Sequence, residues 1–200
     1  MAISLEKGQR IDLTKGNAGL TKLLVGLGWD PVSKKGGGFL GGLFGGGGSN
    51  IDCDSSVLLL ENDRFTDKKN CIFFGNLKSS DGSVVHTGDN LTGEGAGDDE
   101  QVMIDLKNVP QAINKLVFVV NIYDCVSRKQ DFGMIENAFI RVVDQSNNNE
   151  LVRYNLKDDY KGKTSLIVGE IYRNGAEWKF SAVGNGTNDT SITEVVKRYQ

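Results

Sequence analysis

The sequence has little of what marks several large classes of protein. It carries three cysteines, an odd number without paired spacing, which argues against a disulfide framework or a zinc site. No apolar run, including Leu23 to Val25 followed by Leu27, is long enough to cross a bilayer, and the N-terminus has no apolar signal-peptide core. We therefore expect a chain without a direct membrane span, located in the cytoplasm.

Basic stretches are also missing. The net charge is −3, and no run of Lys and Arg offers the positive stripe that neutralises nucleic-acid phosphates. A nucleic-acid partner is therefore excluded. Hydrophobic residues make up 38% of the 200 positions, which is enough to bury one sizeable core. The sequence predicts a single domain over residues 1–200.

Strand signals dominate, and only two prolines interrupt them. Eight runs rich in β-branched or aromatic residues are bounded by Gly, Asn, Asp or Ser. They are 51–60, 71–74, 102–106, 116–123, 138–143, 151–156, 165–172 and 178–183. Asn174-Gly175 predicts a tight hairpin turn, and residues 145–149 predict a longer one. The fold class is mostly β, an antiparallel β-sandwich with short helical elements.

Two short helices are expected beside these strands. One helical turn is predicted after Val109-Pro110, and a C-terminal helix over residues 190–199, capped by Ser191 or Thr193. Residues 36–48 are different, since nine of these thirteen residues are glycine. Ordering so much glycine costs too much backbone entropy, so we expect a flexible insertion. Its four apolar residues keep a docking element as an alternative.

Acidic residues are concentrated in one short window. Residues 81–100 contain six acids and no Lys or Arg, so the window carries −6. The rest of the chain, with 20 acids and 23 bases, carries +3. Self-repulsion at this density disfavours folding unless a cation binds or the segment stays extended in water.

Two fragments supply oxygen ligands for such a cation. Asp52 and Asp54 alternate on an expected strand, so they share one face about 6.5 Å apart, although two solvated carboxylates fit this fragment equally well. The window adds the remaining candidates, Asp81, Asp89, Asn90, Glu94, Asp98, Asp99 and Glu100. Ca²⁺ takes roughly 6 to 8 oxygen ligands in flexible geometry. Eight carboxylates exceed the needs of one ion, so we expect two Ca²⁺ ions.

Other interpretations of the window are weaker. Its alternating glycines resemble a phosphate-binding loop, but acids flank them and no Lys follows. His86, the only histidine, is expected to be a loop residue rather than a catalytic base, because no nucleophile motif accompanies it. Asp81-Gly82 also fits a simple turn, which makes Asp81 a weaker ligand candidate. No catalytic residue is predicted.

These motifs closely resemble the TerD family of bacterial tellurite-resistance and stress-response proteins. The matching segments are Val25 to Asp30, Asp52 to Ser56, Asn76 to Ser83, His86 to Glu100, Phe132-Gly133, Ala138 to Arg141, Gly169 to Arg173 and Glu177 to Phe180. The resemblance implies a cytoplasmic β-sandwich that binds Ca²⁺ through the acidic motif and acts in tellurium resistance and stress response. The chain departs from the family pattern in the glycine-rich insertion and in the tail after Gly184.

The leading functional hypothesis is a non-enzymatic calcium-binding scaffold or sensor. Its partners would be other stress-response proteins, with a membrane reached through them. One alternative is a metal-dependent hydrolase with His86 and Asp98 near the ions. Another is a binding protein for small, nucleotide-like ligands. The scarcity of candidate bases favours the first hypothesis, whereas the biochemical step behind resistance, the partner and the oligomeric state stay open.

Overall fold

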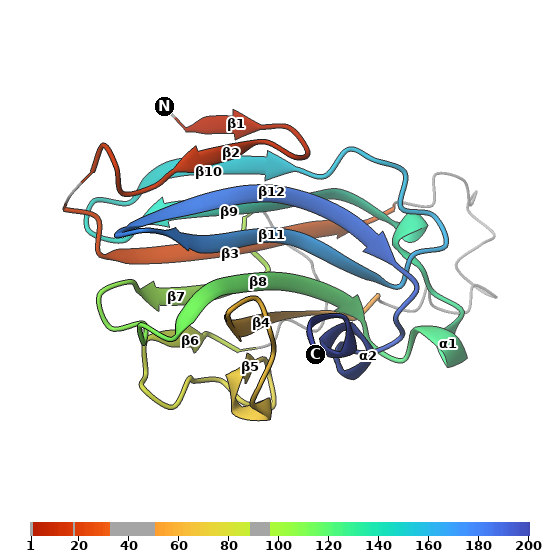
Figure 1. Cartoon of the computed structure of the whole chain (residues 1–200). Helices are drawn as coiled ribbons and strands as arrows, with labels where there is room; N and C mark the ends of the chain where they lie inside the picture. The colour runs from red at the N-terminus through yellow and green to blue at the C-terminus, as the bar shows by residue number, and fades with distance from the viewer. Residues whose placement is uncertain (1, 18, 33–50, 89–96) are drawn as a thin grey trace.

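The structure is a β-sandwich, and its computed structural model describes residues 2–17, 19–32, 51–88 and 97–200. These residues form two six-stranded sheets that lie one over the other (Figure 1). Sheet A has the order β1 (Ile3–Leu5), β10 (Asn149–Asn155), β9 (Ile135–Asp144), β3 (Lys22–Pro31), β7 (Glu100–Asp105), β6 (Val84–His86). Sheet B has the order β2 (Arg10–Asp12), β12 (Glu177–Thr187), β11 (Ser165–Asn174), β8 (Ile113–Ile122), β4 (Cys53–Glu61), β5 (Cys71–Ile72). The predicted mostly-β sandwich is confirmed.

Alternation along the strands builds the core between the sheets. Leu23, Val25 and Leu27 of β3 project inward from sheet A, while Val57 and Leu59 of β4 project inward from sheet B, and all five are at most 1% exposed. Successive side chains of a strand point to opposite faces, so the residues between them lie on the outer faces. Among the strands of the described residues, only β1 pairs in parallel, with β10, and the other strand pairs are antiparallel.

A second apolar cluster lies on the outer face of sheet B. Leu58 and Leu60 of β4 pack there with Val117 of β8 and with Val195 from the C-terminal helix α2 (Ile192–Val196). Ser191 caps this helix by accepting a hydrogen bond from Glu194 N, and η3 (Lys197–Tyr199) follows it. The predicted C-terminal helix is therefore confirmed, with Ser191 as its cap. It covers apolar surface that the sandwich alone would leave exposed.

The remaining helical elements are short. They are η1 (Lys68–Asn70), α1 (Cys125–Arg128) and η2 (Phe132–Met134). The helical turn expected after Pro110 is wrong, because the structure has a turn there that leads straight into β8. None of the helices in the described ranges is long and apolar enough to cross a membrane.

All eight predicted runs are strands, but four strands were missed, β1, β2, β3 and β6. The hairpin at Asn174 is confirmed with a shift of one residue. Asn174 pairs with Glu177 inside the ladder, so Gly175 and Ala176 form the turn, and Gly175 takes the positive φ of 66°. The loop over residues 145–148 is confirmed, whereas the glycine-rich segment 36–48 lies outside the described residues and its flexibility stays a prediction.

Candidate functional site

One end of the sandwich collects most of the predicted ligands that the structure describes. Here β3 ends, β4 and β7 begin and β8 finishes, next to α1 (Figure 1). Asp52 and Asp54 sit at the start of β4, and Asp98, Asp99 and Glu100 sit at the start of β7. Glu100 Oε2 accepts a hydrogen bond from Ser55 N at 2.7 Å, which ties the two sheets together. The fold therefore joins both acidic fragments.

Asp98 anchors its segment to sheet A. Its side chain is fully buried, and both of its oxygens accept hydrogen bonds from the Arg141 guanidinium, at 2.6 and 2.9 Å. Gln101 donates a further bond of 2.9 Å to Oδ2. These bonds raise the pKa of Arg141 above its ordinary value. Both oxygens of Asp98 are thus engaged, and its role in the described structure is to hold residues 97–100 in place.

Two glycines make this arrangement possible. A Cβ atom on Gly26 would collide with the Asp98 carboxylate. A Cβ atom on Gly28 would collide with the Phe139 ring and lie 2.7 Å from Gly97 O. Sheet A can therefore carry the acidic segment directly on its outer face only because β3 has no side chains at these two positions.

Asp99 is held against the end of β3. Its backbone N donates to Leu27 O at 2.8 Å, and its Oδ2 accepts from Trp29 N at 2.7 Å. Burial raises the pKa of the Asp99 carboxyl, against the hydrogen bond from Trp29, and repulsion by Asp30, Glu100 and Asp98 raises it further. Neighbouring acids thus make the ionised form of Asp99 costly.

On sheet B, the carboxyl of Asp52 also has a raised pKa. Burial raises the pKa of its carboxyl, Arg128 partly opposes this, and Glu100 adds repulsion. Arg128 Nη1 lies 3.7 Å from Asp52 Oδ2. Asp52 Oδ1 is buried and has no hydrogen-bond partner in the described part of the chain. An ionised oxygen in this state needs a positive partner.

Asp54 and Cys53 lie next to Asp52 at the start of β4. Asp54 is 6% exposed, and strand alternation places it on the same side of β4 as Leu58 and Leu60. Burial, together with Asp54 and Asp52, raises the pKa of the Cys53 thiol well above its ordinary value. The thiol therefore stays protonated and unreactive, and all three cysteines are free and buried.

His86 is not the loop residue that was expected. It ends β6, its side chain is fully buried, and its Nε2 lies 2.9 Å from Ser55 Oγ and 3.3 Å from Glu100 Oε2. Its Nδ1 accepts from Gly88 N at 3.1 Å. A catalytic triad places the nucleophile and the acid on opposite ring nitrogens, whereas here both approach Nε2 inside the core. This group is a buried polar network between the sheets.

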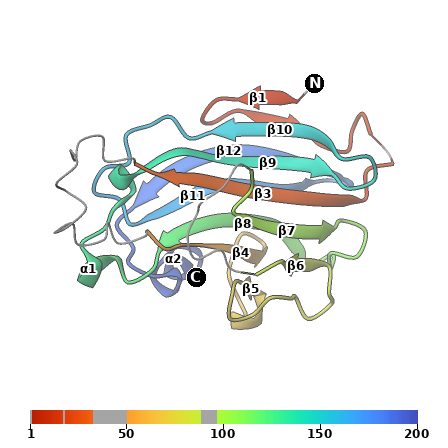
Figure 2. The same ribbon diagram turned by 180° about the vertical axis from the view of Figure 1, so that it is seen from behind.

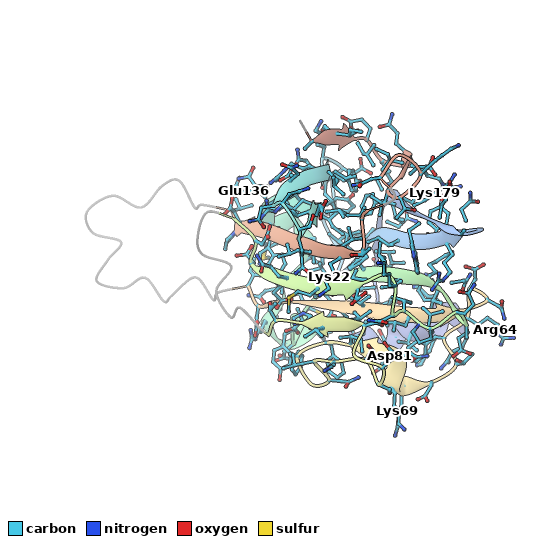
Figure 3. All side chains as sticks on the ribbon, turned by 90° about the vertical axis from the view of Figure 1, so that its left-hand side faces the viewer. Lys22, Arg64, Lys69, Asp81, Glu136 and Lys179 are labelled. Carbon is cyan, nitrogen blue, oxygen red and sulfur yellow. The ribbon has the colours of Figure 1, made fainter. Side chains whose placement is uncertain are left out.

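Asp81 does not join the cluster. β7 runs from Glu100 to Asp105, and Ser83 O accepts from Asp105 N, so Asp81 lies toward the far end of β7, about 16 Å along the strand. Figure 3 shows Asp81 well away from Glu136, the β9 residue that pairs with Asp30. Burial would raise the pKa of Asp81, but hydrogen bonds from Ser83 and Ser79 outweigh it and lower the pKa. The Asp81 carboxylate therefore stabilises the turn in which it lies, through hydrogen bonds from Ser79 and Ser83.

Three predicted ligands, Asp89, Asn90 and Glu94, lie outside the described residues. Among the residues that are described, no three His, Cys, Asp or Glu side chains lie together in an arrangement that could hold a metal ion. The described part supplies a buried, partnerless carboxylate oxygen and several carboxylates that repel one another. It fits one wall of a cation site, and the window between Gly88 and Gly97 would have to supply the rest.

The functional residues that the sequence did not reveal are those that hold the acids. Arg141 and Gly26 position Asp98, and the backbone N–H of Ser55 donates a hydrogen bond to the Glu100 carboxylate. Arg141 belongs to the run Ala138 to Arg141 already noted as a motif, but its partner lies 43 positions away in sequence. Nothing in the local pattern indicates that pairing.

The comparisons with known proteins agree with each other. A family model described as the TerD domain matches residues 1–199. Stress response protein SCP2 of Bacillus subtilis is 74% identical over 199 residues, covering all of both chains. Tellurium resistance protein TerD of Serratia marcescens is 45% identical over 187 residues, covering 93% of this chain and 91% of that one. A crystal structure of a Streptomyces coelicolor homologue of telluride resistance protein TerD superimposes with a TM-score of 0.65 at 20% identity, covering 91% of this chain and 99% of that one, which shows the shared fold.

Proposed function

The chain belongs to the TerD domain family, and from this premise we propose that it is a non-enzymatic calcium-binding stress-response protein of the tellurium-resistance type. Its relatives are named for stress response and for tellurium resistance. The proposed role is that of a scaffold or sensor in the cytoplasm, where Ca²⁺ orders the acidic segments and the ordered surface binds other stress-response proteins.

The observation that carries the proposal is the buried Oδ1 of Asp52, which lacks a hydrogen-bond partner among the described residues. A buried carboxylate oxygen without a partner is costly, and native structures rarely leave one unexplained. Asp99 supports the same inference, since burial and three neighbouring acids raise the pKa of its carboxyl. A hard cation would offset these charges, and carboxylate oxygens are what Ca²⁺ prefers.

The residues divide into ligands and supports. Asp52 and Asp99 would hold Ca²⁺ together with Asp89, Asn90 and Glu94, and Asp54 stays a further candidate on the outer side of β4. Water and backbone carbonyls would have to complete the coordination of a second ion. Asp98 and Glu100 would support them, because Asp98 is bound by Arg141 and Glu100 by Ser55. Catalysis by Ser55 and His86 is disfavoured because both side chains are buried between the sheets, and a hydrolase would need access for its substrate.

Thermal unfolding of the full chain with and without Ca²⁺ tests this function. A ligand that binds only the folded state at a hundredfold excess over Kd adds about 2.7 kcal/mol, so the melting temperature should rise roughly 5–10 °C above that of the chelated protein. Mg²⁺ at the same concentration should give a smaller rise, because it prefers fewer protein ligands and more water. Equal melting temperatures in chelator and in Ca²⁺ would contradict the proposal.

A further inference from the structure

A separate cavity opens on the outer face of sheet A, next to the acidic end. Its volume is about 510 Å³, which falls in the usual range for small-molecule sites. It lies where β3 and β10 finish and β9 begins, at the left-hand end of sheet A in Figure 2. Phe139, Arg153 and Lys157 line it together with Trp29 and Leu156. None of these five residues is among the proposed calcium ligands.

Contacts with Phe139 and Glu150 fix Arg153 in this cavity, and one nitrogen of its guanidinium is not used by them. Its guanidinium carbon lies 4.2 Å from the centre of the Phe139 ring, and Phe139 in turn lies against Gly28. Its Nε and Nη2 donate to Glu150, at 2.9 and 3.5 Å. Its Nη1 makes no hydrogen bond with any described residue. An arginine fixed from two sides and open on the third is suited to binding a carboxylate or phosphate group.

A second cation, Lys157, also lines the cavity. Lys157 Nζ lies 3.0 Å from Glu6 Oε1, and both side chains are about two-thirds exposed, at 65% and 64%. Exposed ion pairs of this kind contribute little to stability, so Lys157 can exchange Glu6 for another anion at small cost. The acid of the cavity, Asp30, is occupied, since its Oδ2 accepts from Asn137 Nδ2 at 2.9 Å.

The walls beside these cations are apolar and locally irregular. Trp29, Ala138 and Leu156 contribute carbon surface, and the Trp29 indole Nε1 is buried without a hydrogen-bond partner in the described ranges. The pairing of β3 with β9 shifts register between Gly28 and Asp30, and Asn137 has a positive φ of 56°. Bulges and strained backbone occur often beside binding sites, where they re-aim side chains.

From this combination we propose that the cavity binds a small organic anion, with its carboxylate or phosphate group on Arg153 and Lys157 and its apolar body against Ala138 and Leu156, beside the 5% of Trp29 that stays exposed. The proposal goes beyond calcium binding and does not depend on it. The binding is therefore tested in the presence of a chelator, so that failure of either proposal leaves the other standing.

The chain has two tryptophans, which gives the test an internal control. Trp29 lines the cavity, whereas Trp178 lies on sheet B under the Arg173 guanidinium, 4.2 Å from it. The indole N–H resonances of the ¹⁵N-labelled chain are assigned with Trp29→Phe and followed during titration with phenyl phosphate, benzoate or inorganic phosphate. We expect the first two to shift the Trp29 resonance saturably and leave Trp178 unchanged, and inorganic phosphate to bind at least about tenfold more weakly, or about 1.4 kcal/mol. The tighter of the two aromatic probes identifies the anionic group.

Variants decide whether the named cations bind the probe. Arg153→Met should weaken binding at least about tenfold, which corresponds to about 1.4 kcal/mol. Lys157→Met, at an exposed position that the fold does not need, should weaken it by a smaller factor. Arg10→Met is the matched control, because Arg10 also lies over an aromatic ring, Tyr172, but on the other sheet. Unchanged affinity in both Arg153→Met and Lys157→Met, equal binding of inorganic phosphate, or shifts that never saturate would overturn the proposal.

Discussion

The predicted acidic ligands differ in how the ionisation of their carboxyl groups affects the stability of the fold. Asp99 and Asp52 have raised pKa values, so folding favours their protonated forms. Their contribution to stability is present at low pH and is lost as pH rises through the folded-state pKa. Asp81 has a lowered pKa, so its contribution is present above the unfolded pKa and is lost as pH falls through the folded one. At neutral pH, Asp99 and Asp52 oppose folding while Asp81 supports it.

Two matched substitutions follow from this difference. Asp99→Asn keeps an acceptor for Trp29 N but removes the charge, so the chelated protein should melt at the same temperature or a few degrees higher. Losing one charged ligand should weaken Ca²⁺ binding at least about tenfold, which lowers the calcium-dependent rise in melting temperature by roughly 3–6 °C. Calorimetric melting of both forms measures the two effects.

Asp81→Asn provides the control. It should lower the melting temperature, because Asp81 holds its turn through Ser83 and Ser79, and it should leave the calcium-dependent rise unchanged. A loss of that rise in Asp81→Asn, or its full retention in Asp99→Asn, would show that the ligands have been assigned to the wrong residues.

Among the elements, β3 decides whether the acidic segment can lie on sheet A. Its sequence from Lys22 to Pro31 contains Gly26 and Gly28, which lower strand propensity, and this is why β3 was missed. The structure shows what these glycines do, since the Asp98 carboxylate and the Phe139 ring occupy the space where their side chains would be. A weak local strand signal therefore marks a close approach between segments.

Gly28→Ala tests this role. The added methyl group meets the Phe139 ring and Gly97 O, so the variant should lose about 1–3 kcal/mol of unfolding free energy and also part of its stabilisation by Ca²⁺. Gly16→Ala is the control, because nothing lies within 4 Å of its added carbon. It should change stability by less than about 0.5 kcal/mol. Equal effects of the two substitutions on thermal unfolding would contradict the close packing at β3.

At the scale of the whole molecule, the long strands of the sandwich were predictable and the convergence of the site only partly so. β8 and β11 are runs of β-branched residues that fit no other element, whereas β1, β2 and β6 have three residues each, too few for a periodic pattern. Asp52 and Asp99 lie at the same end of the sandwich, at the starts of β4 and β7, and their shared role as ligands stays a prediction. Asp81 was grouped with them by its position in sequence, but the antiparallel pairing of β6 with β7 carries it to the other end of the sheet.

The charge balance at the acidic end was also only partly predictable from the sequence. Counting acids locates the acidic fragments, but their charge balance depends on partners from other elements, Arg141 of β9 for Asp98 and Arg128 of α1 for Asp52. His86 was expected to be a loop residue because no nucleophile motif accompanies it, yet its ring lies inside the core with Ser55 and Glu100 beside Nε2. Long-range pairing of this kind leaves no periodic signal in the sequence.

Isothermal titration of chelator-treated full-length protein with Ca²⁺ is the direct test of whether the acidic end binds calcium. We expect saturable heat with a stoichiometry of one or two ions per chain, reduced in Asp99→Asn and in Asp52→Asn and unchanged in Asp81→Asn. No heat beyond dilution, together with no bound Ca²⁺ by equilibrium dialysis, would contradict it, and the acidic window would then be a solvated surface.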